Sequence, residues 1–318
     1  MPLAEMVLNG DVRAAARLMR DIDDARPEAI DELKQLYPHT GGAYIIGITG
    51  PPGAGKSTLV DQLTHSFRKQ GKKVGVVAVD PSSPFTGGAI LGDRIRMNRH
   101  ADDPGVFIRS LATRGAMGGL TRSTSDVALV MDGLGMDVII IETVGVGQDE
   151  CDIVKMAHTT CVVMVPGMGD DIQAIKAGIL EIGDVFVVNK ADRDGVERTC
   201  RDLENMLDMR KSEVGSWRPK VMQTVAQSGS GIKELVGEIQ SHHDFLFSSG
   251  TINDFLRGRN ERHFVDILRD SLFKQAMTFM ESDGELTRVI DGICANNIDP
   301  YSAAEDVMSR MMGTTIDR

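Results

Sequence analysis

The sequence has few aromatic residues, an excess of acidic over basic residues, and no long apolar run. Only 4% of its 318 residues are aromatic, and its formal net charge is −11. Its apolar stretches, such as Val138–Ile141, are far too short to cross a bilayer, and the first residues show no basic stretch leading into an apolar core. An acidic chain is a poor partner for nucleic acid or an anionic membrane. We therefore expect a cytoplasmic protein that binds neither.

Cysteine is scarce, and its spacing argues against a metal centre or a disulfide framework. The cysteines form no CxxC pair, and His158, which precedes Cys161 by three residues, has no second pair to complete a ligand set. We therefore expect reduced thiols in a reducing compartment. The four cysteines are Cys151, Cys161, Cys200 and Cys294.

The order of the apolar segments predicts the fold class. From Tyr44 onward, short β-branched runs alternate with helical patterns, which is typical of a doubly wound α/β domain with a buried, mostly parallel sheet. The ligand of such a domain is expected at the carboxyl ends of the strands. The predicted strands are Tyr44–Thr49, Lys73–Val79, Val106–Arg109, Asp137–Ile141, Thr160–Val165, Asp184–Val188 and Lys220–Thr224.

Helical patterns precede and follow this alternating region. Residues 3–36 read as helices interrupted near Pro27, and after about Phe245 only helical patterns remain. We predict three parts: a helical N-terminal extension over 1–40, the α/β domain over 41–248, and a C-terminal helical arm over 249–318. The predicted helices from the α/β domain onward include Ser57–Gln70, Thr121–Leu134, Ile172–Ile182, Gly195–Arg210, Asp254–Met280, Glu285–Asn296 and Pro300–Met312.

A phosphate-binding loop follows the first predicted strand and opens a helix. It matches the pattern GxxxxGK[ST], in which glycines let backbone N–H groups turn toward phosphates. We expect Lys56 to reach the β- and γ-phosphates, and to be solvated when the loop is empty. We expect the Ser57 hydroxyl to ligate Mg²⁺. The predicted nucleotide-binding residues here are Gly50, Pro51, Pro52, Gly53, Ala54, Gly55, Lys56, Ser57 and Thr58.

A second motif, Asn189-Lys190-Ala191-Asp192, follows the apolar strand that ends at Val188. A carboxylate at Asp192 can accept two hydrogen bonds from guanine, which adenine cannot supply, so the motif predicts GTP rather than ATP. After the next strand, a backbone N–H from the segment Val225, Ala226 and Gln227 is positioned by sequence order to read guanine O6.

Acidic residues end two strands beside the phosphate loop. Glu142 closes the strand before Gly145, and Asp80 closes another. Carboxylates suit Mg²⁺, held directly or through water, and the Gly145 N–H is expected to point at the γ-phosphate. Common GTPases carry aspartate where Glu142 stands.

Several segments together resemble the MeaB/ArgK/MMAA family, GTPases that act as chaperones of adenosylcobalamin-dependent acyl-CoA mutases. The similarity runs from about residue 3 to residue 312. The segments that carry it are Asp80–Ser83 and Thr86–Met97 for a first switch, Thr113–Leu120, Glu142–Gln148 for a second switch, and Pro166–Lys176 for a third.

The resemblance implies roles for particular residues and partners. It implies Mg²⁺ ligands at Ser57, Asp80, Asp93 and Glu142, with Lys56, Asp93 and Gly145 serving catalysis. It implies that Gln148, Asp170, Asp171, Gln173 and Lys176 couple nucleotide state to the mutase. It also implies a homodimer formed through the C-terminal helices, and an adenosyltransferase as a further partner. Cobalamin would be handled by those partners and is not expected to bind here.

Two departures and two rival functions qualify this reading. Related metallochaperone GTPases carry Cys or His metal motifs and an extra lysine early in the phosphate loop, where Pro51 and Pro52 stand, so nickel or cobalt insertion is disfavoured. No residue stands where a Ras-like glutamine would orient water, because Gln148 lies three positions beyond Gly145, so intrinsic hydrolysis is expected to be slow. The rivals are a P-loop kinase acting on a small acceptor and a non-catalytic guanine-nucleotide-binding scaffold.

Overall fold

The computed structural model of the protein divides into two compact units, Met1–Leu256 and Arg257–Arg318. None of the helices in the described part of the chain is long and apolar enough to cross a membrane. The residues that the structure describes are 1–80, 98–112, 122–143, 153–167, 179–209, 215–281, 284–311 and 313.

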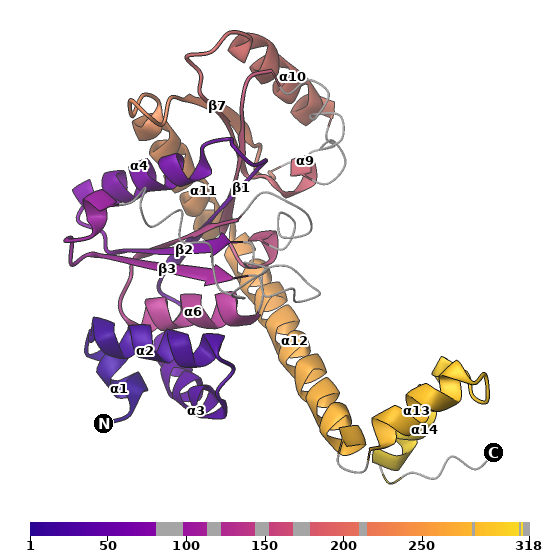
Figure 1. The fold of residues 1–318 in the computed structure, drawn as a ribbon. Helices are drawn as coiled ribbons and strands as arrows, with labels where there is room; N and C mark the ends of the chain where they lie inside the picture. The colour runs from indigo at the N-terminus through magenta and orange to yellow at the C-terminus, as the bar shows by residue number, and fades with distance from the viewer. Residues whose placement is uncertain are drawn as a thin grey trace. The chain divides into compact units, whose positions relative to one another are not determined.

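A seven-stranded parallel sheet forms the framework of the first unit (Figure 1), with the order β3-β2-β4-β1-β5-β6-β7. This confirms the predicted doubly wound α/β fold. The chain builds one side of the sheet as far as β4 and then crosses β1 to build the other. The strands are β1 (Tyr44–Thr49), β2 (Val74–Asp80), β3 (Val106–Ala112), β4 (Val138–Glu142), β5 (Thr159–Met164), β6 (Val185–Asn189) and β7 (Lys220–Thr224).

The predicted strand positions are confirmed to within three residues. The largest difference is β3, which runs through Ala112 rather than ending at Arg109. Its last residues pair with the end of β2, in the register Val79 to Leu111 and Asp80 to Ala112. Backbone pairing therefore extends this strand beyond its apolar run.

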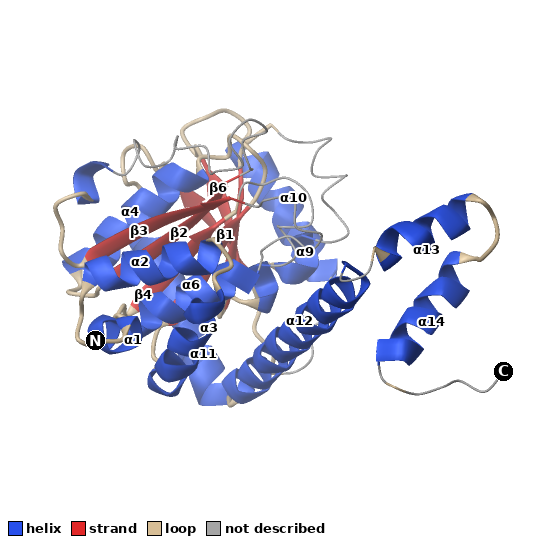
Figure 2. Ribbon diagram, turned by 60° about the horizontal axis from the view of Figure 1, so that its bottom comes forward, coloured by secondary structure: helices blue, strands red, loops and turns tan. Residues whose placement is uncertain are grey.

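Helices cover both faces of the sheet (Figure 2). Alternate side chains of one strand point to opposite faces, so Val77 and Val79 pack with α6 while Val74 and Val76 pack with α4 and α11. Burial on both faces explains why these strands are continuous apolar runs. The helices of this unit include α4 (Lys56–Lys69), α6 (Arg122–Gly133), α9 (Ile179–Ile182), α10 (Val196–Met209) and α11 (Ile232–Ser249).

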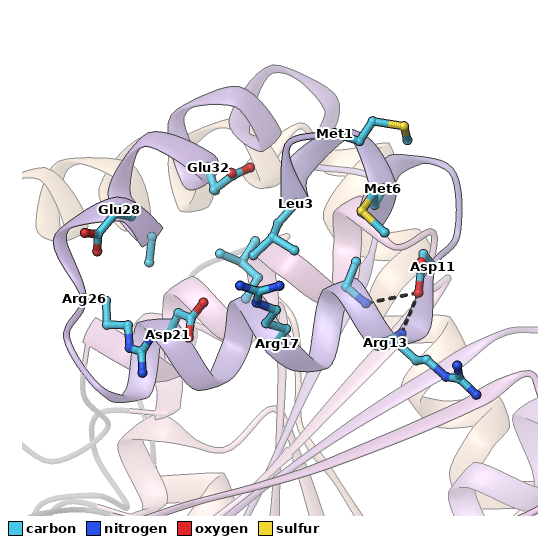
Figure 3. A pocket seen from close by; sticks show the side chains of 13 residues that line it. Met1, Leu3, Met6, Asp11, Arg13, Arg17, Asp21, Arg26, Glu28 and Glu32 are labelled. Atoms are coloured by element: carbon cyan, nitrogen blue, oxygen red, sulfur yellow. Dashed lines mark hydrogen bonds and ion pairs between the residues drawn. The ribbon is translucent and has the colours of Figure 1, made fainter.

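The N-terminal helices belong to the same compact unit. They are α1 (Leu3–Leu8), α2 (Val12–Asp23) and α3 (Pro27–Leu36), and Pro27 is the first residue of α3. Leu18 and Met19 of α2 are fully buried in a cluster that includes Met131 of α6. Asp11 caps α2 by accepting hydrogen bonds from the N–H groups of Arg13 and Ala14 at 2.8 and 3.1 Å (Figure 3).

A cavity of about 590 Å³ lies among these three helices and is lined by both charged and apolar side chains (Figure 3). Arg17 of α2 and Glu32 of α3 belong to its wall, and Glu32 accepts a hydrogen bond from the Ala4 N–H at 2.6 Å. Among the described residues that line it, none belongs to the predicted nucleotide site.

Helix α11 is absent from the helices predicted above, although Leu235, Val236 and Ile239 show helical spacing and are buried. Gly231 precedes the helix with φ +76°, and a Cβ there would lie 2.1 Å from the Gln223 carbonyl oxygen. Only glycine therefore allows the chain to turn this closely past β7.

A buried polar cluster lies where β1, β5 and β6 begin, at the end of the sheet opposite the phosphate loop. The Oγ1 atom of Thr159 lies 2.6 Å from Nδ1 of His242, whose Nε2 lies 3.6 Å from Oδ1 of Asp184. The Trp217 indole donates to the Asp184 carbonyl at 2.8 Å and stacks at a tilt on His242. Burial lowers the pKa of His242 to about 4, despite the nearby carboxylate.

The second unit is helical, as predicted. Helix α12 (Thr251–Glu281) begins in the first unit and continues into the second, followed by α13 (Glu285–Cys294) and α14 (Pro300–Met311). Arg310 of α14 forms ion pairs with Glu285 of α13 and with Asp306, the latter at 3.1 Å, and lies 6.0 Å from the centre of the Phe279 ring. These contacts connect the three helices to one another.

Candidate nucleotide site

The phosphate loop joins β1 to α4, in the strand–loop–helix context that the sequence indicates. Gly50, Gly53 and Gly55 have φ values of +134°, +75° and +89°. A Cβ on Gly50 would lie 2.0 Å from the Val163 carbonyl oxygen, and one on Gly55 would lie 2.5 Å from Nδ2 of Asn189. The loop conformation therefore requires glycine at two positions for lack of space, as well as for backbone freedom.

Lys56 differs from the expectation of a solvated side chain. It is only 6% exposed, and its ammonium group donates to the carbonyl oxygens of Gly50 at 2.7 Å and Pro51 at 3.1 Å. The lysine therefore lies inside the curve of its own loop. The expectation was wrong because carbonyls of the loop replace the water that would otherwise surround the charge.

Ser57 and Glu142 are in direct contact, although they are far apart in the sequence. The Ser57 hydroxyl donates to Oε1 of Glu142 at 2.7 Å, and both side chains are buried. β4 pairs with β1 in the register Ile48 to Glu142, which brings the end of β4 beside the phosphate loop. A hydroxyl and a carboxylate oxygen are hard ligands of the kind that Mg²⁺ prefers.

The end of β2 lies at the same edge of the sheet. β2 pairs with β4 in the register Ala78 to Glu142, and Asp80 is its last residue. The backbone of Asp80 therefore lies two positions past the point opposite Glu142.

Asn189 joins three segments of the site. Its Nδ2 donates to the Ala54 carbonyl of the phosphate loop at 2.9 Å. Its Oδ1 accepts from the Thr224 hydroxyl and from the Ala226 N–H, each at 3.1 Å. With 2% of its surface exposed, Asn189 is a buried connection between β6, the phosphate loop and the loop after β7.

Lys190 makes a second connection to the phosphate loop. Its ammonium group donates to the Gly53 carbonyl at 2.7 Å, and its backbone has φ +58°. A positive φ is uncommon for a residue other than glycine, and such strain is concentrated at functional sites. The motif after β6 is therefore tied to the phosphate loop by two consecutive side chains.

The two groups expected to bind the base differ in whether they already make hydrogen bonds within the protein. Asp192 is exposed, and its carboxylate has no hydrogen-bond or ion-pair partner in the described ranges. The Val225 N–H donates to the Ser230 carbonyl at 3.0 Å, and the Ala226 N–H to Asn189. Among these three backbone positions, the Gln227 N–H has no partner within the described residues.

The connecting roles of Thr224 and Thr143 were missed in the sequence. Thr143 follows Glu142, and its hydroxyl donates to Oγ1 of Thr49, at the end of β1, at 3.1 Å. Both residues stand at a strand end, which is the signal that could have marked them. Several predicted residues lie outside the described ranges, namely Asp93, Gly145, Gln148, Asp170, Asp171, Gln173 and Lys176.

None of the three cysteines in the described ranges is among the residues of this site. Cys161, Cys200 and Cys294 form no disulfide, and burial raises the pKa of the Cys161 thiol, which keeps it protonated and unreactive. No group of three or more His, Cys, Asp or Glu side chains in the described ranges is arranged to hold a metal ion.

Comparison with known proteins decides the family. Residues 15–281 match the family model described as methylmalonyl Co-A mutase-associated GTPase MeaB. The chain belongs to the MeaB family of GTPases. The structural arrangement agrees with this assignment, because the phosphate loop and the guanine-type motif meet at one edge of a parallel sheet.

Relatives from distant organisms cover most of the chain. A Pyrococcus abyssi protein whose name describes it as a GTPase is 49% identical over 314 residues, which are 98% of this chain and 96% of its own. The mouse protein named methylmalonic aciduria type A homolog, mitochondrial, is 39% identical over 267 residues, which are 82% of this chain and 64% of its own.

A solved structure supports the fold independently. The crystal structure of a protein named LAO/AO transport system kinase has a TM-score of 0.70 and covers 98% of this chain and 96% of its own. At 24% sequence identity, this likeness shows the fold alone.

Proposed function

We propose that this chain is a Mg²⁺-dependent GTPase whose nucleotide state controls its action as a chaperone of an adenosylcobalamin-dependent acyl-CoA mutase. The observation that carries the GTP assignment is the junction at Asn189, which holds the guanine-type motif against the phosphate loop. A base paired with Asp192 would then lie within reach of phosphates held by the loop. The mutase assignment is supported by the family description and by the name of the mouse relative.

Within this proposal, Ser57 and Glu142 hold Mg²⁺ together with Asp80 and Asp93. When bound, Mg²⁺ neutralises charge that develops on the transferred phosphoryl group. Lys56 leaves the carbonyls of its own loop and donates to the β- and γ-phosphates instead. The exchange keeps the ammonium group hydrogen-bonded in both states, which limits the cost of burying its charge.

Orientation of the attacking water is the step for which the sequence offers no residue at the position of a Ras-like glutamine. The Gly145 N–H would hold the γ-phosphate, and Gln148 lies three positions further on. We therefore propose slow intrinsic hydrolysis that the mutase accelerates by completing the site.

The hydrolysis assay compares GTP with ATP in the presence of Mg²⁺ and follows the γ-phosphate. The proposal expects phosphate release to water from GTP and little from ATP. Transfer of the γ-phosphate to a small solute would favour a P-loop kinase instead.

The mutase assay measures binding of a cobalamin-binding mutase subunit with a non-hydrolysable GTP analogue and with GDP. Lys176→Ala, in the predicted third switch, should keep GTP affinity within a few-fold and remove the difference between the two nucleotide states. Gln173, with Asp170 and Asp171, belongs to the same predicted contact. Coupling of about 1–3 kcal/mol corresponds to a measurable affinity ratio. Equal protection of the mutase by GTP and by the analogue would favour the non-catalytic scaffold.

The second unit fits the proposed homodimer. Phe264, Leu268 and Leu272 of α12 are spaced by four residues, so they share one helix face, and each is at least 45% exposed. A second copy of this chain would cover this apolar face. Sedimentation at several concentrations should show a dimer for the wild type and a monomer for Phe264→Glu.

A further inference from the structure

The cavity among the three N-terminal helices has the size of a small-molecule pocket. Its volume of about 590 Å³ falls within the range of about 300–1,000 Å³ that is usual for such pockets. Helices α1, α2 and α3 all contribute residues to its wall (Figure 3). A ligand in the cavity is therefore in contact with protein on several sides.

Part of the wall is apolar and is held in place by the core. The apolar residues that line the cavity include Leu3 of α1, Ala14 and Leu18 of α2, and Ala29 of α3. Ala14, Leu18 and Ala29 are buried in the same cluster as Val77 of β2. This part of the wall suits the apolar portion of a ligand, because burial of apolar surface is favourable.

Two arginines of α2 place positive charge on another part of the wall. Arg13 and Arg17 are four residues apart, so they lie on the same face of the helix. In the described part of the chain, neither guanidinium group forms a hydrogen bond or an ion pair. Like charges at this spacing repel each other. An anion bound between them would offset the repulsion and accept hydrogen bonds from the guanidinium N–H groups in bidentate geometry.

Most acidic residues of the wall are already engaged by the protein. Asp11 caps α2, and Glu32 accepts a backbone N–H of α1 at 2.6 Å. Asp21 forms ion pairs with two arginines, at 3.1 and 3.6 Å. Glu28 is exposed in the first turn of α3, and Figure 3 shows it at the opposite edge of the cavity from Arg13. The charged groups that the wall offers to a ligand are therefore mainly positive.

We propose that this cavity is a binding site for a small organic anion, which carries a carboxylate or phosphate group and a short apolar body. The anionic group binds Arg17, in the middle of the wall, and Arg13 beside it (Figure 3). The apolar body packs against Leu3 and Leu18. The inference does not rest on the proposed GTPase function, because it uses no residue of the nucleotide site.

The test is titration calorimetry of the full-length protein with probes that separate charge from apolar contact. GDP is present throughout, so that the phosphate loop does not compete for anions. Hexanoate and hexyl phosphate carry both features, hexanamide lacks the charge, and inorganic phosphate lacks the apolar body. We expect saturable binding of hexanoate, hexyl phosphate or both, about 10-fold or more tighter than binding of hexanamide and inorganic phosphate. The tighter of the two anions identifies the anionic group that the site prefers.

Variants show whether the probe binds in this cavity. Arg17→Gln should weaken binding of the tighter probe about 10-fold or more, because hydrogen bonds to a charged group are lost. Ala29→Leu should also weaken it, by filling the apolar side of the cavity without a change of charge. Arg20→Gln is the matched control and should bind the probe as the wild type does, because Arg20 is an exposed arginine of α2 that is not among the described lining residues.

The melting temperature of each variant is measured as a check of folding. Arg17→Lys, which keeps the charge but not the bidentate geometry, should fall between the wild type and Arg17→Gln, and it replaces Arg17→Gln if that variant does not fold. Equal affinity of the wild type and the Arg17 variant for the probe would overturn the proposal. Equal binding of hexanamide, or no saturable binding of either anionic probe, would overturn it as well.

Discussion

Asn189→Ala should destabilise the nucleotide-free protein as well as abolish guanine binding. The substitution removes one donor and one acceptor that together make three hydrogen bonds. The Ala54 carbonyl and the Ala226 N–H then lose their partner, and both residues are at least 97% buried. The Thr224 hydroxyl can rotate to another acceptor, so its loss counts for less.

The magnitude follows from the two orphaned backbone groups. A buried polar group without a partner costs about 1–3 kcal/mol, so two of them cost roughly 2–6 kcal/mol, less whatever water recovers by entering the space of the lost side chain. We therefore expect a loss of about 3 kcal/mol in the free energy of unfolding, against a total of about 5–15 kcal/mol for a typical domain. For a unit of this size, that lowers the melting temperature by roughly 6–12 °C.

The assay is thermal unfolding of the nucleotide-free protein, with GDP affinity measured separately. Asp192→Ala is the matched control, because it lies in the same motif but is exposed and has no partner in the described ranges. The control should lose GDP affinity and keep the wild-type melting temperature. If Asn189→Ala melts with the wild type, the three-segment junction does not stabilise the empty site, and our reasoning is refuted.

Three further predictions concern other parts of the unit. Asp192→Asn should weaken GTP binding roughly 10- to 100-fold and accept xanthosine triphosphate, because xanthine carries a carbonyl where guanine carries its amine; equal affinity of the wild type for ATP and GTP would contradict the base assignment. Lys56→Met should lower hydrolysis by about 100-fold or more and reduce the unfolding free energy by about 1–3 kcal/mol, since two loop carbonyls lose a charged donor; an unchanged melting temperature would show that these contacts do not stabilise the empty loop. The pKa of His242, about 4 when folded and 6.5 when unfolded, means that the unfolded state binds more protons between these values. The contribution of neutral His242 to the free energy of unfolding should therefore be complete above pH 6.5 and fall by roughly 2–3 kcal/mol as the pH drops to 4. This pH-dependent loss should disappear in His242→Gln and persist in the control His39→Gln, which changes an exposed histidine.

The fold could be read from the sequence because buried parallel strands are continuous apolar runs. Such runs located β1 to the residue and β2 to β6 to within three residues. β7, a mixed polar and apolar segment that is only partly buried, was also located to the residue. The GxxxxGK[ST] pattern likewise located the phosphate loop, because its glycines are required by the local backbone. Helix α11 was missed although its apolar spacing was present, since its length and the turn at Gly231 depend on packing against β7 and the sheet.

The hydrogen bonds and ion pairs between side chains could not be predicted from the sequence in this way. Asn189 contacts residues 135 positions earlier and 37 positions later, and no local pattern encodes those distances. The burial of Lys56 depends on how the carbonyl groups of the loop are oriented. The loop sequence does not distinguish this orientation from one that would leave the lysine solvated. The ion pair between Asp61 of α4 and Arg99, at 2.8 Å, likewise joins residues 38 positions apart in the sequence.

The close packing of Gly50 connects Lys56 of the phosphate loop with the backbone of β5. Its carbonyl accepts the ammonium group of Lys56, and the space that its missing side chain would fill is held by the carbonyl of Val163 in β5. A ligand that draws Lys56 away would remove a hydrogen bond from the Gly50 peptide, which packs directly against the backbone of β5. β5 runs directly into Val165–Gly167 and then into the segment predicted to contact the mutase. The absence of a side chain at Gly50 thus lets the phosphate loop touch β5 directly, one residue beyond the stretch Ile46–Thr49 in which β1 pairs with β5.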